Sequence, residues 1–336
     1  MSQPILEVIE LRKHFIQRRG LLDALTREAD VRVIPAVDGV SFRLHENETL
    51  GLVGESGCGK TTTGKAILKL MMMNGGEIRY RGTDITAYTP AQFRPLRRDI
   101  QMIFQDLDAA LNPKVRIEDT LREAILVREP DADDAAVQRQ IYELLDLVNL
   151  KKNKLSNLPS ELSGGEKRRI GIARVLAVRP KLIVADEPTS ALDVSIQAQV
   201  INLLRDLQAK FGLSYLFISH DLQLVELMSH RVAVMYLGQI VEMGPAKEIA
   251  HTPRHPYTSV LWSSIVEKRS LEVPVGGGSS AWGVFDFERP SGGCRFAPRC
   301  PVYAARGRPS ECTDPANPPK LKSTGTDHVV ACHFPL

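Results

Sequence analysis

The chain has 336 residues, of which 43% are hydrophobic and 25% are charged, a composition typical of a globular protein with one large and one smaller domain. Its formal net charge of +3 is too small to indicate a nucleic-acid-binding protein. No apolar run reaches the ~18 residues that a membrane-spanning helix needs, and the N-terminus lacks the basic-then-apolar pattern of a secretion signal. We therefore expect a cytosolic chain that could still sit on a membrane-bound partner.

The first 53 residues predict short strands. Residues 5–8 and 40–44 alternate apolar and polar side chains, as half-buried antiparallel strands do. Between them, the basic and irregular stretch from Arg18 to Val33 predicts a surface loop. Phe15 precedes this loop, and its ring is either a core residue or a stacking surface for an adenine base.

A glycine-rich turn joins an apolar run at 49–53 to a predicted helix that begins near Lys60. It matches G-x-x-x-x-G-K-[ST], in which glycines let backbone N–H groups surround a polyphosphate at a helix N-terminus. Lys60 is expected on the terminal phosphates and the Thr61 hydroxyl on Mg²⁺. The flanking strand and helix disfavour the alternative, a turn with a chance lysine. The predicted phosphate-binding residues are Gly54, Glu55, Ser56, Gly57, Cys58, Gly59, Lys60, Thr61 and Thr62.

A helical insert is predicted between two strands. Residues 100–104 form an apolar run that ends at Gln105, and the apolar spacing from 117 to 150 is helical. A further helix then opens at Ser163, whose spacing to Glu166 is that of a capping box. Gly164 and Gly165 follow the cap. Two glycines there are unfavourable unless the backbone must approach something closely, and such a helix start is also an anion site.

Two carboxylates, Asp186 and Glu187, end a continuous apolar run that predicts a parallel strand covered on both faces. Ligands bind at this end of open α/β sheets, so Asp186 is expected to hold Mg²⁺ through water and Glu187 to polarise an attacking water. A solvated turn is the alternative. A second buried strand, at 214–218, leads to His220, which we interpret as a phosphate or water contact rather than a structural histidine.

Four of the five cysteines fall in the last 43 residues, in a segment with few aliphatic side chains and many prolines. In a reducing cytosol this favours metal or cluster binding, which would supply stability that burial does not. The spacings of five, eleven and nineteen residues lack the C-x-x-C pairs of zinc ribbons, and four thiolates suit zinc or an iron–sulfur cluster. Incidental cysteines are the alternative. The candidate ligands are Cys294, Cys300, Cys312 and Cys332.

With these motifs in order, the chain resembles the ATP-binding subunits of ABC transporters, and more narrowly those of dipeptide, oligopeptide and nickel importers. The resemblance rests on a Walker A loop, a Q-loop glutamine, a signature sequence, a Walker B strand with its catalytic glutamate, a switch histidine and the cysteine tail. In this sequence these are Gly54–Thr61, Gln105, Leu162–Glu166, Asp186 with Glu187, His220, and Cys294 to Cys332.

The resemblance implies an α/β fold, a P-loop NTPase cassette with a RecA-like core, an antiparallel β subdomain and a helical subdomain, plus a small Cys-rich C-terminal extension. The implied boundaries are 1–250 for the ATPase domain, about 106–178 for its helical subdomain and 251–336 for the extension. The tail cysteines imply a [4Fe–4S] cluster, with Zn²⁺ still open.

The implied activity is ATP hydrolysis that energises import of dipeptides, oligopeptides or a related solute. Lys60, Glu187 and His220 would act in catalysis, and Thr61 and Gln105 would hold Mg²⁺. ATP would lie between the Walker A loop of one subunit and the signature residues Ser163, Gly164 and Gly165 of another.

The implied partners are a second ATP-binding subunit in a heterodimer, two transmembrane permeases and a solute-binding protein, with no nucleic acid. The chain would be peripheral on the cytoplasmic face of the inner membrane. Glu166 departs from the family's usual glutamine, and its charge either repels nucleotide or serves only the helix cap. The alternatives are an ABC ATPase that is not coupled to transport and a regulatory module without turnover.

Overall fold

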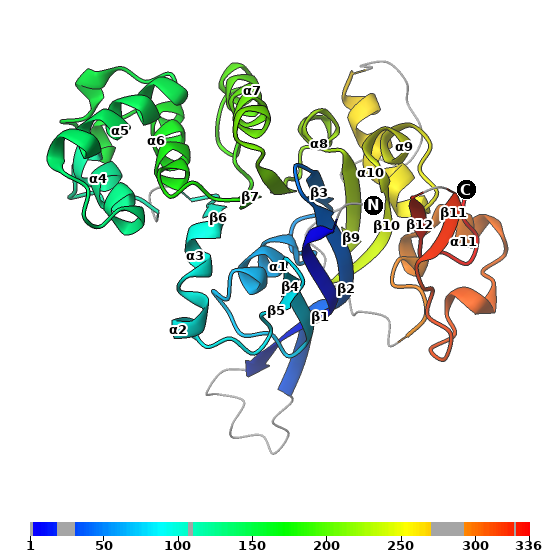
Figure 1. The fold of residues 1–336 in the computed structure, drawn as a ribbon. Coiled ribbons are helices and arrows are strands. Elements are labelled where there is room, and N and C mark those ends of the chain that lie inside the picture. The colour runs from blue at the N-terminus through cyan, green and yellow to red at the C-terminus, as the bar shows by residue number, and fades with distance from the viewer. Residues whose placement is uncertain (1–2, 19–30, 107–109, 270–291, 326) are drawn as a thin grey trace.

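The structure is a computed structural model that describes residues 3–18, 31–106, 110–269, 292–325 and 327–336. Strands form two sheets, and helices cover the larger one (Figure 1). The strands are β1 (Pro4–Arg18), β2 (Val31–His45), β3 (Thr49–Val53), β4 (Gly75–Tyr80), β5 (Thr83–Asp84), β6 (Ile100–Ile103), β7 (Leu182–Asp186), β8 (Ser214–Ile218), β9 (Arg231–Tyr236), β10 (Gln239–Pro245), β11 (Lys322–Gly325) and β12 (His328–Val330). The α-helices are α1 (Lys60–Ile67), α2 (Pro90–Phe93), α3 (Leu96–Asp99), α4 (Ile117–Arg128), α5 (Asp134–Leu147), α6 (Gly164–Ala177), α7 (Val194–Phe211), α8 (Leu222–Met228), α9 (Ala246–His251), α10 (Pro256–Arg269) and α11 (Pro301–Ala305).

The larger sheet has the strand order β11-β12-β10-β9-β3-β8-β7-β6 among the described residues. Its central strands β9, β3, β8, β7 and β6 run parallel. Every residue of β3, β7 and β8 is buried, as expected for parallel strands covered on both faces. The predicted parallel strand that ends in Asp186 is therefore confirmed. The strand β3, which leads into the glycine-rich loop, lies between β8 and β9.

The smaller sheet, in the order β2-β1-β4-β5, contains the two N-terminal strands. The strands β1 and β2 pair antiparallel from Leu6↔Leu44 to Arg18↔Val31, so each is much longer than predicted. Residues 31–33, predicted to belong to a loop, are strand, because the valines of Val31-Arg32-Val33 favour extended backbone despite the basic residue between them. The rest of the predicted loop, residues 19–30, lies outside the described residues.

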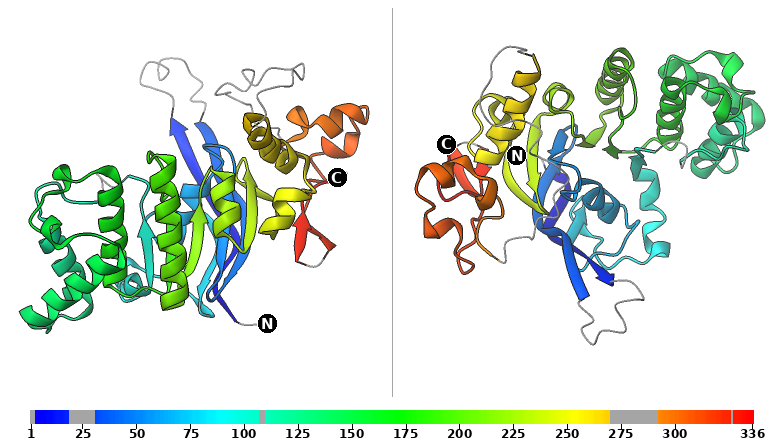
Figure 2. Two further views of the ribbon diagram at one scale, coloured as in Figure 1. Left: turned by 90° about the horizontal axis from the view of Figure 1, so that it is seen from above. Right: turned by 180° about the vertical axis from the view of Figure 1, so that it is seen from behind.

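The helices α4, α5 and α6 pack against one another at one end of the larger sheet, and we call them the helical subdomain (Figures 1 and 2). The helical prediction for this stretch is confirmed. The side chains that hold it together are aliphatic and fully buried, among them Leu121, Ile125, Val137, Ile141 and Leu145. In the part of the chain that the structure describes, no helix is both long and apolar enough to cross a bilayer.

The C-terminal segment, residues 292–336 without residue 326, lies at the opposite end of the larger sheet (Figure 2). Its strand β12 pairs with β10, with Glu242 opposite Val330, so the tail extends the central sheet. The side chain of Glu242 is fully buried, and its Oε1 lies 2.7 Å from Nε2 of His328. His328 Nδ1 lies 3.1 Å from Glu248 Oε2. These polar contacts thus hold the C-terminal segment, which has few aliphatic side chains, against β10 and α9.

Candidate nucleotide-binding site

The glycine-rich loop, residues 54–59, leads from β3 into α1, and we call it the phosphate loop. Gly54 and Gly59 both have positive φ angles, of 149° and 111°. A Cβ atom on Gly54 would lie 2.1 Å from the carbonyl oxygen of Met235, and one on Gly59 would lie 2.2 Å from that of Ala36. Only glycine fits at these two positions, because the neighbouring backbone leaves no space for a side chain.

Lys60 begins α1 and turns its ammonium group back into the phosphate loop. Its Nζ donates hydrogen bonds to the carbonyl oxygens of Gly54, at 2.7 Å, and Glu55, at 3.0 Å. The buried thiol of Cys58 lies 3.7 Å from the same nitrogen. Burial raises the pKa of Cys58, and Lys60 only partly offsets this, so the thiol stays protonated at neutral pH. The loop therefore presents a cation to its interior.

The hydroxyl of Thr61 donates a hydrogen bond of 2.9 Å to Oδ1 of Asp186, at the C-terminal end of β7. Asp186 is almost fully buried, and burial raises its pKa while the bond from Thr61 opposes that shift. A hydroxyl and a carboxylate are oxygen ligands of the kind that Mg²⁺ prefers. The sequence predicted both residues, and the structure brings them together.

Glu187 lies between two other predicted residues. Its Oε2 accepts a hydrogen bond of 2.9 Å from Nε2 of Gln105, and its Oε1 lies 3.1 Å from Nδ1 of His220. Its backbone has a φ of 46°, unusual for a residue other than glycine, and its N–H donates to the carbonyl of Ile218. Strained backbone of this kind clusters at functional sites, where the surroundings hold it.

Arg168, on α6, was not predicted. It is 3% exposed, and its guanidinium donates hydrogen bonds to the carbonyl oxygens of Phe104, at 2.8 Å, and Gln105, at 3.1 Å. Burial lowers its pKa. The run Lys167-Arg168-Arg169 is typical of a solvated basic surface, and only the helical spacing to the buried Ile172 signals that Arg168 faces inward.

The signature residues lie at the N-terminus of α6 rather than in the phosphate loop. Ser163 accepts a hydrogen bond from the N–H of Glu166, and Glu166 accepts one from the N–H of Ser163, which confirms the predicted capping box. Ser163 and Gly164 are exposed, and a Cβ on Gly165 would lie 3.1 Å from Ile196 on α7. Lys154 lies 2.9 Å from the Glu166 carboxylate and lowers its pKa. The negative charge that Glu166 carries in place of the family's usual glutamine is therefore paired with Lys154 of the same chain.

Two residues from beyond residue 250 reach the phosphate loop at Glu55, and neither was predicted. The N–H of Glu55 donates a hydrogen bond of 3.0 Å to the hydroxyl of Tyr257. The Glu55 carboxylate forms a two-pronged ion pair with Arg299, at 2.8 and 2.9 Å. The contacts join positions 202 and 244 residues apart, and no local pattern signals them.

Phe15 lies on β1 with 41% of its surface exposed, and Lys13 Nζ is 5.1 Å from the ring centroid. This exposure removes the alternative that Phe15 is a core residue. Its predicted role in stacking on adenine stays a prediction.

The four tail cysteines line one small cavity at the base of α10, together with His255, Phe296 and His333. Burial raises the pKa of Cys294, Cys312 and Cys332, to about 11 for Cys332. In the described part of the chain, however, no three or more Cys, His, Asp or Glu side chains adopt a metal-binding arrangement. The four predicted ligands thus lie around one cavity, without the geometry of a metal site among the described residues.

A phosphate loop, a hydroxyl–carboxylate pair and a glutamate held by glutamine and histidine, all at the C-terminal edge of a parallel sheet, define the ATP-binding cassette of ABC transporters. Comparisons with known proteins agree. The family described as "ABC transporter" matches residues 37–190, and the one described as "Oligopeptide/dipeptide transporter, C-terminal region" matches residues 241–306. The chain therefore contains an ATP-binding domain of the ABC transporter family followed by the C-terminal region of oligopeptide/dipeptide transporters.

The chain is similar to the glutathione import ATP-binding proteins GsiA of Shigella boydii and Escherichia coli K12. It is 50% identical to each over 266 residues, which cover 79% of this chain and 41% of the relative. The chain thus spans about two fifths of the length of these relatives.

Solved structures share the fold. The ATP-binding cassette MJ0796, a dimer bound to ADP and Pi, has a TM-score of 0.63 at 23% identity over 72% of this chain and 98% of its own. CbiO1 from Clostridium perfringens has the same TM-score and identity, over 75% of this chain and 93% of its own.

Proposed function

We propose that this chain binds MgATP at the phosphate loop and hydrolyses it to drive import of a peptide-type solute. One observation carries the proposal: Glu187 is held between Gln105 and His220, next to the Thr61–Asp186 pair. The matched oligopeptide/dipeptide region and the glutathione-import relatives support transport over an uncoupled ATPase. They also make a small peptide such as glutathione the solute class to test first.

The residues divide the chemistry among them. The Lys60 ammonium and the loop N–H groups bind the β- and γ-phosphates, replacing the lysine's bonds to loop carbonyls. Thr61, Gln105 and Asp186 fit Mg²⁺, directly or through water, and the ion would neutralise charge on the phosphates. Glu187 orients and polarises the attacking water, and His220 supports it from the γ-phosphate side. Phe15 offers an exposed ring for the adenine base.

A second subunit would complete the site. Ser163 and Gly164 are exposed at the start of α6, where N–H groups and the helix dipole suit an anion. The dimeric cassette MJ0796 supports a paired arrangement, and the partner we propose is a different ATP-binding subunit.

The catalytic assignment is tested by Glu187→Gln in the purified assembly. We expect ATP hydrolysis to fall by about a thousandfold, because the water loses its orienting carboxylate. ATP binding should persist and hold the two subunits together, seen as an ATP-dependent shift in size-exclusion chromatography. Glu187→Gln with normal turnover would refute the role. Glu226→Gln, on α8, serves as the control and should hydrolyse ATP at the normal rate.

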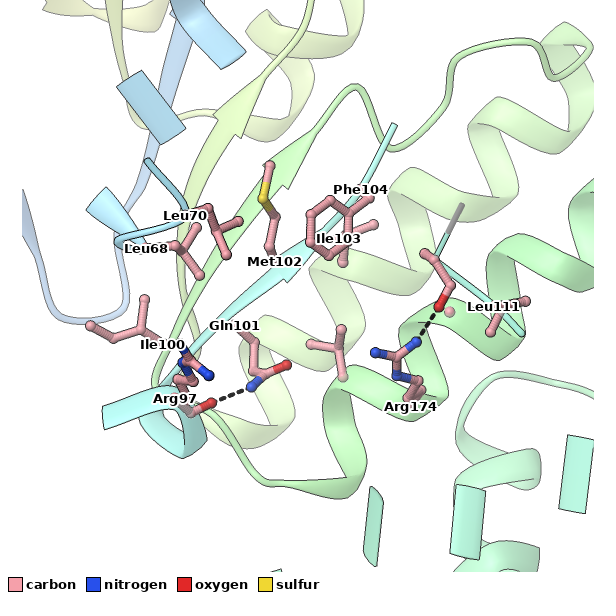
Figure 3. A pocket seen from close by; sticks show the side chains of 13 residues that line it. Leu68, Leu70, Arg97, Ile100, Gln101, Met102, Ile103, Phe104, Leu111 and Arg174 are labelled. Carbon is pink, nitrogen blue, oxygen red and sulfur yellow. Dashed lines mark hydrogen bonds between the residues drawn. The ribbon is translucent and has the colours of Figure 1, made fainter. Parts of the chain in front are cut away.

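A groove between the core and the helical subdomain is the proposed docking site for a membrane-embedded permease. Figure 3 shows that Leu70, Phe104 and Leu111 line it with apolar side chains and that Arg97 and Arg174 add charge. Arg174 donates a hydrogen bond to the carbonyl of Ala110, and the Gln101 amide donates one to the carbonyl of Arg97. Because Gln105 lies two residues after β6, movement of a permease helix in the groove would reach the catalytic centre.

The proposed assembly has two permeases and a solute-binding protein, with this chain peripheral on the cytoplasmic face of the inner membrane. Co-purification from membranes tests this. A replacement such as Leu70→Glu, which puts a charge in the groove, should release the chain from membranes while leaving nucleotide binding intact.

The cysteine cavity is proposed to hold a [4Fe–4S] cluster or Zn²⁺. Two observations support a metal there: four thiols line one cavity, and the buried Nε2 of His333 in the same lining has no hydrogen-bond partner. Iron, sulfide and zinc analysis of anaerobically purified protein, with its absorption spectrum, tests this. If neither iron nor zinc is found in stoichiometric amount, the four cysteines are incidental.

A further inference from the structure

Two side chains from the region that follows β10 contact the phosphate loop at Glu55. Its N–H donates to the hydroxyl of Tyr257, and its carboxylate pairs with both terminal nitrogens of Arg299. One contact fixes the backbone of the loop and the other fixes its side chain. Both come from the region that follows β10, beyond the strands that carry the catalytic residues.

The two contacting side chains are themselves closely packed. Tyr257 is 1% exposed, and its ring centroid lies 4.6 Å from that of Tyr236 and 5.4 Å from that of Phe296. The Arg299 side chain is 12% exposed, and its guanidinium lies over the Tyr236 ring at 5.8 Å. Because packing already restricts these side chains, little conformational entropy is lost when they hold the loop.

A second set of contacts links the C-terminal segment to the phosphate loop. Arg295 donates hydrogen bonds to the carbonyl of Leu237 and to the Asp38 carboxylate. Next to Leu237, the N–H of Gly238 donates to the carbonyl of Cys58, at 2.9 Å. The C-terminal segment therefore supports the loop near its beginning and near its end.

The charge of Glu55 makes this support necessary. A carboxylate at the mouth of a loop that receives a polyphosphate repels that ligand unless a cation cancels it. The Glu55 side chain is 42% exposed, so the repulsion is partly screened, and Arg299 supplies the cancelling charge at the carboxylate, whereas Lys60 bonds the backbone carbonyl of the same residue.

We propose that Arg299 and Tyr257 are positioning residues of the ATP site: the C-terminal segment neutralises and orients Glu55, and nucleotide affinity depends on it. The proposal rests on the proposed function, in which this loop binds ATP. The two residues touch the loop and not the reacting atoms, so they govern affinity rather than the chemical step.

The test measures the affinity of the full chain for adenylyl imidodiphosphate with Mg²⁺ by calorimetry. Arg299→Ala leaves the Glu55 charge uncompensated and should weaken binding by about tenfold. Glu55→Gln in the Arg299→Ala chain removes that charge and should restore most of the affinity. Arg306→Ala is the matched control, because this arginine lies over the Phe334 ring, 4.9 Å from its centroid, rather than on the loop.

Two further readouts separate positioning from a general loss of structure. The loss in Arg299→Ala should shrink at high salt, and it should raise the KM for ATP while kcat stays within about twofold. Tyr257→Phe keeps the ring and its packing but removes the acceptor of the Glu55 N–H, and should weaken binding roughly threefold.

The proposal is overturned if Arg299→Ala binds nucleotide as the wild type does, or if Glu55→Gln fails to rescue it. If Tyr257→Phe binds nucleotide with wild-type affinity, Tyr257 has no positioning role. Lys60→Ala is measured in parallel. Normal binding by Lys60→Ala would reject the loop as the ATP site, whereas its loss beside an unaffected Arg299→Ala would reject only the positioning role.

Discussion

The helical subdomain and the C-terminal segment flank the nucleotide site at opposite ends of the larger sheet, and they are stabilised by different means (Figure 2). The helical subdomain is held by buried aliphatic side chains such as Leu121, Ile141 and Leu145. The C-terminal segment is held by the buried Glu242–His328 contact, by aromatic rings and by arginine ion pairs. Apolar burial tolerates some repacking, whereas a buried charge that loses its partner is strongly destabilising.

The two regions also reach different parts of the site. The helical subdomain reaches the catalytic end, through Arg168 and the backbone of Gln105. The C-terminal segment reaches the phosphate loop, through Arg299 and Glu55. Changes in the first region should therefore alter turnover, and changes in the second should alter nucleotide affinity.

Of the changes that compare these two regions, Arg168→Ala is expected to have the largest effect on steady-state kinetics. It removes two hydrogen bonds from a charged donor to the segment that carries Gln105, which destabilises the fold by about 2–3 kcal/mol. Displacement of Gln105 from Glu187 should lower kcat more than about tenfold with little change in affinity. Arg169→Ala is the control, since Arg169 on the same helix bonds the Val148 carbonyl instead. A normal kcat in Arg168→Ala would contradict the claim that the helical subdomain controls turnover.

His328→Ala should have the next largest effect. It leaves the fully buried Glu242 without its imidazole partner, at a destabilisation of about 3 kcal/mol. Loosening of β12 from β10 should pass to Tyr257 and raise the KM for ATP roughly threefold. Glu248→Gln, at a side chain that is 51% exposed, should change stability by less than about 1 kcal/mol. Thermal unfolding and steady-state kinetics measure both, and a lower kcat with normal KM would contradict the division of roles.

The smallest effect is expected from Lys154→Ala. It uncovers the carboxylate of Glu166 at the signature, and should weaken ATP-dependent association of subunits by two- to fivefold, or about 0.5–1 kcal/mol. Glu166→Gln in the same chain should restore association, because no charge is left to compensate. Lys152→Ala, whose ammonium lies over the Tyr142 ring, is the control. Light scattering with ATP measures association, and failure of the rescue would assign Glu166 to the helix cap alone.

Local patterns in the sequence predicted the elements that position the site. The glycines of the phosphate loop, the Ser163–Glu166 capping box and the buried strand before Asp186 all lie where expected. Each depends on residues close together in the chain, so composition and spacing suffice. The extent of β1 and β2 was underestimated, because basic residues interrupt strands whose valines and isoleucines still favour extended backbone.

The contacts of Arg168, Tyr257 and Arg299 could not be predicted. Each joins positions more than 60 residues apart, and an arginine in a basic run is typical of a solvated surface. Only the folded sheet makes these contacts: it places the residues after β6 beside Arg168, and it places Tyr257 and Arg299 beside the phosphate loop. The tail cysteines could be grouped by spacing, but their arrangement in the cavity depends on packing against His255 and could not be predicted.

The position of β3 has a consequence for biosynthesis. Thr49 on this strand pairs with Tyr215 on β8, and Val53 pairs with Val234 on β9, so both neighbours are translated long after it. A nascent chain that has emerged only as far as α7 therefore contains the glycines of the phosphate loop but lacks β8 and β9, the strands on either side of β3. A product truncated before β8 should therefore lack both strands that flank β3 and, on the proposed function, should not bind ATP.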